Sequence, residues 1–552
     1  MRRAGVVREA HGMGDEGGWG GRFVRALPAL LVAAITLVVL IHAAPTILSF
    51  WAAMLRWPYP MQGSESLMVW EASKLAHGES IYVANGPERH GFVSGPYTPL
   101  YFATVAATLR LSDTVYTGGR LIALGAWLTL LATIGALIWQ AAPRRAGVLG
   151  ALVGMAGLAT FTPGIIWAVR VKPTIPALAL AVIGLLIVQR SWRSPRRAYL
   201  WALVPFIAAY FTKQTSLAAP LAATLFLLRW AGWRPALRFV LVGALGGLLP
   251  FAALTVLTGG EFFRHIVADR RLRWEPQLVL NFGALFLRDF WPLLAAAAVG
   301  ALALVWLRRA SIAPFYLACA LAFVATIGVE GADHDHLIEL AAASALAVGS
   351  ALAVALDGSR RTSLAAWPLA VLLAAQLVTG WTPDKWYAQE LADPTPQTRR
   401  QLDLIVTNIR NTPGAVLSEE IGLNILAGKG VPYDDPQAMA ALARAGRWDQ
   451  RQLLDDLQAR RFALVILPAN PRDAIWTPEV LAAIHENYDL KFRDVWFTYE
   501  AKPGRRKACF FTMLRHSACI DNRSELHRPL CYLPSGWSSP PSHGIILEIK
   551  VS

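Results

Sequence analysis

Residues 26–51 read ALPALLVAAITLVVLIHAAPTILSFW, a run without a single Asp, Glu, Lys or Arg. An α-helix needs roughly 20 apolar residues to cross the hydrocarbon core of a bilayer, so this run predicts a transmembrane helix. Arginines precede it at positions 2, 3, 8, 22 and 25. Basic residues ahead of a first span favour a cytoplasmic N-terminus, and the run is too long for a cleaved signal peptide. We therefore expect residues 1–25 to form a basic cytoplasmic tail.

Similar apolar runs recur as far as Trp381. With the first run, they predict about eleven spans, at residues 26–51, 121–140, 146–167, 174–189, 198–211, 216–228, 239–257, 290–307, 312–327, 337–356 and 364–381. The 552-residue chain is 55% hydrophobic and only 16% charged, which is more apolar surface than a soluble fold of this length can bury. Residues 26–381 are therefore expected to form a mainly α-helical, multi-span membrane domain.

Basic residues occupy every second connection between these runs. They are Arg144 and Arg145, then Arg190, Arg193, Arg196 and Arg197, then Arg229, Arg234 and Arg238, then Arg308 and Arg309, then Arg360 and Arg361. Arginine clusters of this kind stay on the cytoplasmic side of a membrane, so the net charge of +15 indicates membrane topology and no nucleic-acid partner. The alternation predicts a plasma-membrane protein whose other connections and C-terminus are extracytoplasmic.

Two segments complicate this topology. Tyr97–Leu111 is apolar but short, and counting it as a span would invert every later connection, so we interpret it as a re-entrant or interfacial helix. The outward connection at residues 259–289 is basic and holds Arg264, Arg270, Arg271, Arg273 and Arg288. Its sequence is consistent with an interfacial amphipathic helix or with a site for an anionic ligand.

The composition changes after Trp381. Residues 382–503 carry charge at the density of a globular protein, and helical periodicity, as in QLDLIVTNIRN, alternates with short β-rich runs such as FALVILP. We expect a small extracytoplasmic α/β domain there. Residues 504–552 lack periodicity and include SGWSSPPSHG, a composition typical of disorder.

Polar side chains collect on the predicted outward connections. The candidate substrate-binding residues there are Glu71, Lys74, Tyr97, Arg120, Arg170, Lys172, Lys213, Gln214, Asp333, His334, Asp335, His336 and Glu339. Ionisable groups near a membrane are costly unless they face water, a partner or a ligand, so their collection predicts a polar cavity that opens outward. A structural network between the ends of the spans would show the same bias.

The segment GADHDHLIEL, at residues 331–340, contains possible ligands for a divalent metal in Asp333, Asp335 and His336. These side chains converge only if the segment is extended, because residues two apart diverge on a helix. Hydrogen bonding to a sugar or acceptor, or capping of the span that begins at Leu337, are the alternatives. We expect no cofactor to be required and leave a divalent metal open.

The first outward connection, at residues 52–120, contains SESLMVWEASKLAHGESIY at 64–82. Apolar and charged residues mix there at spacings of three and four, which predicts an amphipathic helix lying on the membrane. Glu65, at the N-terminal edge of this helix, has two possible roles. It could cap the helix, or it could be a catalytic general base that deprotonates an acceptor at the mouth of the cavity.

Five segments in succession resemble a known family: ESLMVWEASKLAHGESIY, GPYTPLYF, GGRLIALGAWLTLL, VRVKPTIPALAL and FTKQTSLAAPLA. Their order is similar to that of the GT-C superfamily of integral membrane glycosyltransferases, with the protein O-mannosyltransferases and the lipid A aminoarabinose transferase as nearer relatives. The resemblance covers roughly residues 26–381 and, more loosely, the outer domain.

This resemblance implies inverting transfer of a hexosyl or pentosyl group from a polyprenyl-phosphate donor to a lipid, glycan or protein acceptor. An acid of the first outer loop acts as base or orients the acceptor in such enzymes, and Glu65 stands where the family usually has Asp. The acid that the family commonly has in the second outer connection is missing from RVKPT, which holds Lys172 and Thr174. Lys213 would neutralise the leaving phosphate, unless it merely extends from a span end to the interface.

Two other classes of protein compete with this interpretation. The first is a transporter or flippase of a lipid-linked or polar substrate, which usually carries ionisable residues inside its spans and repeated halves. The spans here are rich in Ala, Leu and Val with few charges. The second is a non-catalytic assembly or sensor protein that uses the outer domain for binding.

The alternation of arginines makes a topological prediction. Reporter fusions at Arg22 and at Asp384 should report opposite sides of the membrane, because an odd number of spans separates the two positions. Fusions that report the same side would mean that Tyr97–Leu111 crosses the membrane, and the assignment of the outward connections would then fail.

Overall fold

The computed structural model describes residues 19–61, 63–86, 90–111, 114–142, 145–357, 366–380, 395–468, 475–493 and 496–502. These described residues belong to one compact unit. The predicted tail at 504–552 lies outside the described residues, as do the first 18 residues of the predicted cytoplasmic tail.

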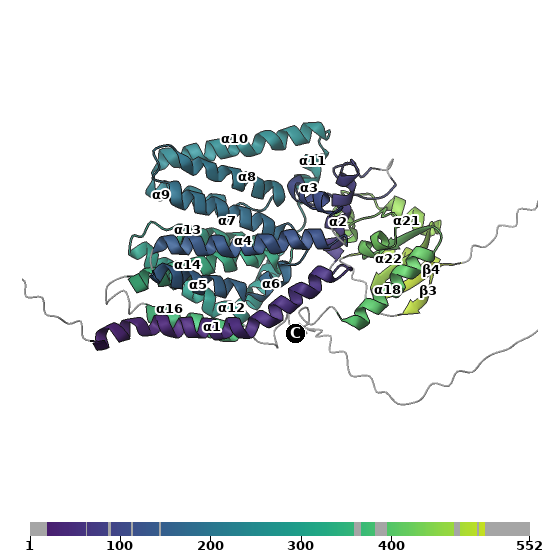
Figure 1. Ribbon diagram of the computed structural model, residues 1–552. Coiled ribbons are helices and arrows are strands. Elements are labelled where there is room, and N and C mark those ends of the chain that lie inside the picture. The colour runs from purple at the N-terminus through teal and green to yellow at the C-terminus, as the bar shows by residue number, and fades with distance from the viewer. Residues whose placement is uncertain are drawn as a thin grey trace, which may run out of the picture. The chain divides into compact units, whose positions relative to one another are not determined.

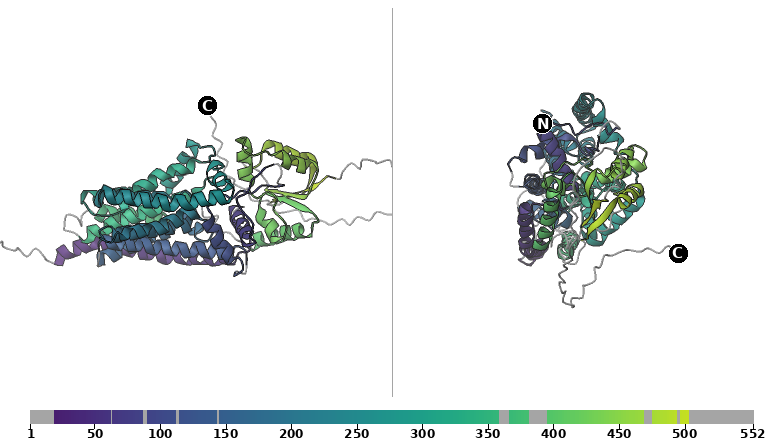
Figure 2. Two further views of the ribbon diagram at one scale, coloured as in Figure 1. Left: turned by 90° about the horizontal axis from the view of Figure 1, so that it is seen from above. Right: turned by 90° about the vertical axis from the view of Figure 1, so that its right-hand side faces the viewer.

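Long helices lie side by side in a membrane domain (Figure 1; Figure 2, left). They are α1 (Trp19–Arg56), α4 (Thr117–Ala141), α5 (Arg145–Ala159), α7 (Thr174–Ser191), α8 (Leu203–Thr212), α9 (Ala218–Trp230), α10 (Trp233–Leu257), α12 (Pro276–Trp306), α13 (Ala313–Phe323), α14 (Leu337–Asp357) and α16 (Ala366–Gly380). The short helices α2 (Gly63–Ala76), α3 (Pro99–Thr108), α6 (Thr162–Trp167) and α11 (Glu261–Phe263) lie toward one end of this bundle.

Within the described residues, six helices are long and apolar enough to cross a membrane, and five shorter apolar helices match the remaining predicted runs. The prediction of a mainly α-helical, multi-pass membrane protein is confirmed. Helix α3 has only 10 residues, which makes it about 15 Å long, whereas the hydrocarbon core is about 30 Å thick. Helix α8 has the same length and is counted among the apolar helices because the turn Ala198–Ala202 extends it, so the interpretation of residues 97–111 as a re-entrant or interfacial helix stays a prediction.

The basic connection at 259–289 contains α11, a π-helical turn at Arg264–Ala268 and, from Pro276, the first part of α12. The backbone of Phe290 leaves the helical region (φ −131°, ψ 15°), and Pro292 follows within the same helix. Proline removes a helical hydrogen bond and crowds the preceding turn, so α12 consists of two helices joined at a kink, and the second begins where the predicted span at 290–307 begins. The two interpretations of the connection, an interfacial helix or a site for an anionic ligand, stay predictions.

Helix α14 is the central helix of the bundle, with 94% of its most apolar window buried. It packs closely against α5, where a Cβ atom added to Gly150 would lie 2.6 Å from the carbonyl oxygen of Gly349. Small residues at helix crossings let the two backbones approach, which is a principal source of helix association in lipid. The sequence therefore encodes the inner packing of the bundle through glycine as well as through apolar length.

Residues 395–502 include a four-stranded sheet with the order β1-β2-β4-β3. Strands β1 (Ala415–Ser418) and β2 (Phe462–Pro468) are parallel, and β4 (Trp496–Ala501) is antiparallel to β2 and to β3 (Tyr488–Arg493). The helices are α18 (Pro396–Asn411), α19 (Ile421–Leu426), α20 (Pro436–Arg444), α21 (Arg451–Gln458) and α22 (Pro478–Asn487). The expected small α/β domain is present.

Both faces of this sheet are covered. Leu464 and Ile466 of β2 belong to an apolar cluster with α18 and with Trp57 and Tyr59, which follow α1. Val465 and Leu467 point to the other face, into the cluster formed with α20, α21 and α22, because successive side chains of a strand alternate between faces. The C-terminal domain is thereby joined to the end of the first transmembrane helix.

The glycine contact between α5 and α14 can be tested with a matched pair of substitutions. Gly150→Val should lower the free energy of unfolding by about 1–3 kcal/mol, because the added carbons overpack the crossing. Gly157→Val, on the same helix but with no atom within 4 Å of its Cβ position, should have a much smaller effect. Thermal unfolding in detergent measures both, and equal losses would contradict the proposed crossing.

Candidate active site

Helix α2 is buried on two opposite sides, which corrects the expectation of a surface helix. On one side Glu65 contacts Arg120 of α4. The other side faces two acids of the C-terminal domain. The Ser66 hydroxyl donates a hydrogen bond to Glu420, and the Lys74 ammonium lies 3.0 Å from Asp434. Its charged side chains therefore face other parts of the protein and not solvent.

Glu65 and Arg120 form an ion pair in which both side chains are completely buried. Arg120 Nη2 donates to Glu65 Oε2 at 3.0 Å, while the backbone N–H groups of Met61 and Val171 donate to the two carboxylate oxygens at 2.9 and 2.8 Å. The remaining guanidinium hydrogens point to the carbonyl oxygens of residues 54, 57 and 59. This network holds the end of α1, the start of α2, the start of α4 and the chain before α7 together.

The surroundings of Glu65 keep its carboxylate ionised. Burial alone raises the pKa of Glu65, but the positive charge of Arg120 and the hydrogen bonds from Arg120, Met61 and Val171 lower it below its usual value. Glu65 does not line the cavity described below. Its predicted roles, as a cap of the helix or as a base at the mouth of a cavity, stay predictions.

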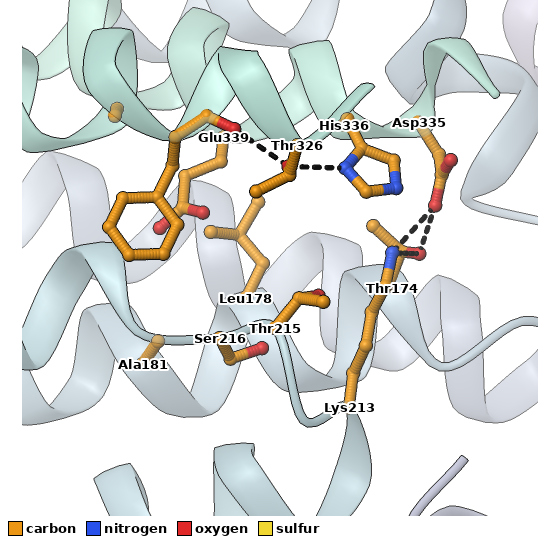
Figure 3. A pocket seen from close by; sticks show the side chains of 12 residues that line it. Thr174, Leu178, Ala181, Lys213, Thr215, Ser216, Thr326, Asp335, His336 and Glu339 are labelled. Carbon is orange, nitrogen blue, oxygen red and sulfur yellow. Dashed lines mark hydrogen bonds and ion pairs between the residues drawn. The ribbon is translucent and has the colours of Figure 1, made fainter. Parts of the chain in front are cut away.

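A second buried ion pair lines a cavity among the ends of the membrane helices (Figure 3). Lys213 directly follows α8, and its Nζ lies 2.8 Å from Asp335 Oδ2 and 2.8 Å from the hydroxyl of Thr174. Thr174 is the first residue of α7 and also donates to Asp335, which lies on the short 3₁₀ turn His334–His336 before α14. Three connections far apart in sequence thus meet at one point.

Further polar side chains surround this pair. His336 Nδ1 lies 2.9 Å from the hydroxyl of Thr326, and Tyr316 donates a hydrogen bond to Glu339 Oε1. Thr215, Ser216 and the apolar residues Leu178, Ala181, Ala320 and Phe323 complete the lining. The cavity volume is about 40 Å³, close to the space of one water molecule, so a sugar phosphate enters only if the walls move.

The electrostatics of this cavity suit an anion. Helices α7 and α14 both begin at its wall, and helix N-termini carry partial positive charge. Lys213 adds a full positive charge, which Asp335 partly neutralises. A phosphate could replace the carboxylate of Asp335 on this lysine, because both groups accept hydrogen bonds from an ammonium.

The other predicted binding residues divide between two neighbourhoods. Lys172 and Tyr97 lie close enough to act electrostatically on Asp335 and Lys213 respectively. Gln214 donates to the carbonyl oxygen of Pro96. Glu71 and Lys74 lie elsewhere, at the contact of α2 with the C-terminal domain.

Arg170 lies over the indole ring of Trp167, and the His334 ring packs edge-on against the same indole. The Arg170 guanidinium lies 4.3 Å and the His334 ring 4.2 Å from the ring centre of Trp167. Asp333 pairs with His334 and accepts a hydrogen bond from its backbone N–H. Asp333, Asp335 and His336 therefore have different partners, and no group of three or more His, Cys, Asp or Glu residues in the described parts of the chain is arranged to hold a metal.

Sequence analysis missed the two acids that the C-terminal domain contributes to α2. Glu420 lies just beyond the carboxyl end of β1, and Asp434 precedes Asp435, the N-cap of α20. Acids are common in both situations because they cap helices. These two acids differ from ordinary capping residues only in their contact with α2, which lies more than 350 positions away in the sequence.

The fold is similar to that of solved GT-C membrane glycosyltransferases, in agreement with the order of the sequence motifs. It is similar to ArnT from Cupriavidus metallidurans in the apo state, with a TM-score of 0.55 and 13% identity over 86% of this chain and 100% of that chain. The ArnT structure bound to undecaprenyl phosphate gives a TM-score of 0.54 and 13% identity over 84% and 99% of the two chains.

The Archaeoglobus fulgidus oligosaccharyltransferase tethered with an acceptor peptide matches with a TM-score of 0.44 and 12% identity, over 88% of this chain and 75% of that chain. No family model and no curated protein matches the sequence.

The Glu65–Arg120 pair gives a prediction that separates a structural from a catalytic role. Glu65→Gln should lower the free energy of unfolding by about 3–5 kcal/mol, because it leaves a buried guanidinium without its counter-charge. The exposed carboxylate Glu79 provides the control, and Glu79→Gln should leave the thermal unfolding temperature unchanged. A stable Glu65→Gln protein that binds donor and fails to transfer would instead support Glu65 as the base.

Proposed function

We propose that this protein transfers a sugar from a polyprenyl-phosphate donor to an acceptor at the outer side of the plasma membrane. The observation that carries the proposal is the Lys213–Asp335–Thr174 cluster, which lines a cavity where helix ends of a GT-C fold meet. The structure of ArnT with undecaprenyl phosphate supports a lipid phosphate as the ligand. The arginine-rich connections support a cytoplasmic N-terminus and an extracytoplasmic C-terminal domain.

In the proposed reaction the donor phosphate binds the ammonium of Lys213 and displaces the carboxylate of Asp335. The hydroxyl or amine of the acceptor attacks the anomeric carbon, the bond from that carbon to the phosphate oxygen breaks, and the polyprenyl phosphate leaves with the electron pair. Lys213 and the N-terminus of α7 stabilise the charge that develops on this leaving group. The stereochemistry at the anomeric carbon inverts.

Three carboxylates are candidates for the proton that the acceptor loses: Asp335, Glu65, and Glu339, which lines the cavity but accepts a hydrogen bond from Tyr316. Asp335 lines the cavity and is freed when the phosphate takes its place on Lys213, whereas Glu65 is enclosed by Arg120 and two backbone N–H groups. We therefore assign the base to Asp335 in this mechanism. Under this assignment the Asp335→Asn protein should still bind donor, but its rate of sugar transfer should fall by about 10²- to 10⁴-fold.

The donor site is tested by removing the ammonium. In purified protein, Lys213→Met should reduce the rate at which polyprenyl-phosphate sugars are consumed by about 10²- to 10³-fold, because one stabilising charge on the leaving group is lost. Lys213→Arg should retain part of the activity, and Lys491→Met, at an exposed lysine of the C-terminal domain, should retain all of it. Mass spectrometry of the lipid measures consumption, and full activity of Lys213→Met would contradict the proposed donor site.

A further inference from the structure

Three ionisable groups meet where α2 contacts the C-terminal domain, away from the Lys213 cavity. Glu71 and Lys74 come from α2, and Asp434 comes from the loop before α20. The side chains of Glu71 and Asp434 are completely buried and that of Lys74 is 8% exposed. Lys74 Nζ lies 3.0 Å from Asp434 Oδ2 and 3.8 Å from Glu71 Oε1.

Charge balance within this cluster requires a proton. Two buried carboxyl groups, those of Glu71 and Asp434, lie beside the single ammonium of Lys74. No donor from the described residues reaches Glu71 Oε2. With one carboxyl group protonated, the other carboxylate balances the charge of Lys74 and the cluster is neutral. If both carboxyl groups were ionised, a net negative charge would remain in a buried site.

The cluster also holds the segment Ser94–Thr98, with the sequence SGPYT, which we call the strap. The backbone N–H of Ser94 donates to Asp434 Oδ1 at 3.0 Å, and that of Gly95 donates to Glu71 Oε1 at 3.3 Å. Gly95 has φ +46°, and a Cβ atom there would lie 2.5 Å from the carbonyl oxygen of Ile81. Only glycine fits this position without strain.

Other charged groups reach the strap at Ser94. The Ser94 hydroxyl donates a hydrogen bond to Asp435 Oδ2. The backbone carbonyl oxygen of Ser94 accepts a hydrogen bond from Arg270 and lies 2.8 Å from His265 Nδ1. Tyr82, which Glu71 influences electrostatically, donates to the carbonyl oxygen of Tyr97. Tyr97 is itself a titratable residue of the strap, and it interacts electrostatically with Lys213 and Tyr101.

The far end of the strap reaches the proposed donor site. The amide group of Gln214, next to Lys213, donates to the carbonyl oxygen of Pro96, and the hydroxyl of Thr98 donates to the carbonyl oxygen of Tyr210 on α8. The strap thus connects the C-terminal domain at one end to the chain that carries Lys213 at the other.

We propose that Glu71 and Asp434 share one proton and, with Lys74, form a pH-sensitive clamp that fastens the strap to the C-terminal domain. Burial and the neighbouring Asp434 raise the pKa of Glu71 well above its usual value. The folded protein therefore binds this proton more tightly than the unfolded chain. The stabilisation is complete at low pH and is lost as the pH rises through the folded pKa. Its effect on sugar transfer rests on the proposed function, but the clamp itself does not.

Hydrogen–deuterium exchange of the full-length protein in detergent tests the clamp without measuring activity. The amides of Ser94 and Gly95 are direct reporters because the two carboxyl groups accept their hydrogen bonds. After correction for the intrinsic pH dependence of exchange, their protection should fall by up to about tenfold per pH unit above the folded pKa. Protection that is constant from pH 6 to pH 10 would overturn the proposal.

Substitutions locate the titrating group. Glu71→Gln keeps the size and polarity of the side chain without a titrating proton, so protection of the strap should become independent of pH, and Asp434→Asn should have the same effect. Asp449→Asn, at an exposed carboxylate of the same domain, should keep the wild-type pH dependence. If Glu71→Gln and Asp434→Asn retain that dependence, the proton is held elsewhere and the clamp is wrong. The wild-type titration decides the question alone if neither variant folds.

Discussion

The buried ion pair between Glu65 and Arg120 fixes the end of the bundle at which both proposed sites lie. Arg120 extends from the first turn of α4 and donates to backbone carbonyl oxygens just after α1, so its guanidinium is saturated before any ligand arrives. Glu65 accepts from Val171, three residues before α7 begins. Thr174, at the start of α7, then contacts Lys213 and Asp335. A change in the first pair would therefore move the wall of the cavity.

Much of the membrane architecture could be predicted because apolar length and arginine placement act locally. The eleven runs correspond to helices of the structure, and the glycosyltransferase-like order of motifs agrees with the observed fold. The kink at Phe290 lies at the start of the predicted span at 290–307. The residues before it, including Arg288 and Asp289, are too polar for a hydropathy pattern to join them to the span, although the helix runs through them.

Several residues that line the cavity were among the predicted binding residues, but the sequence did not show which of them lie together. Lys213 and Asp335 were both expected to bind substrate, yet sequence spacing gives no sign that they form one ion pair, since 122 positions separate them. Glu71 and Lys74 have the spacing of a solvent-exposed helical pair. They are buried instead because Asp434, from a domain whose sequence resembles an ordinary soluble fold, covers them. Burial of a charged residue depends on its tertiary partner, which a local pattern does not contain.

Helix α2 takes part in two clusters of charged side chains, the Glu65–Arg120 pair and the cluster of Glu71, Lys74 and Asp434. The clusters differ in how their charges balance, and this difference gives them different physical roles. Glu65 and Arg120 are matched one to one, with every polar contact made by a fixed backbone or guanidinium group, so the pair has no reason to change within the physiological pH range. Glu71 and Asp434 would together carry two negative charges against the single positive charge of Lys74, so one of them must be protonated for the cluster to be neutral. The first group therefore serves as a rigid anchor toward the membrane helices. The second makes the attachment of the C-terminal domain depend on proton concentration, at the same helix but on its opposite side.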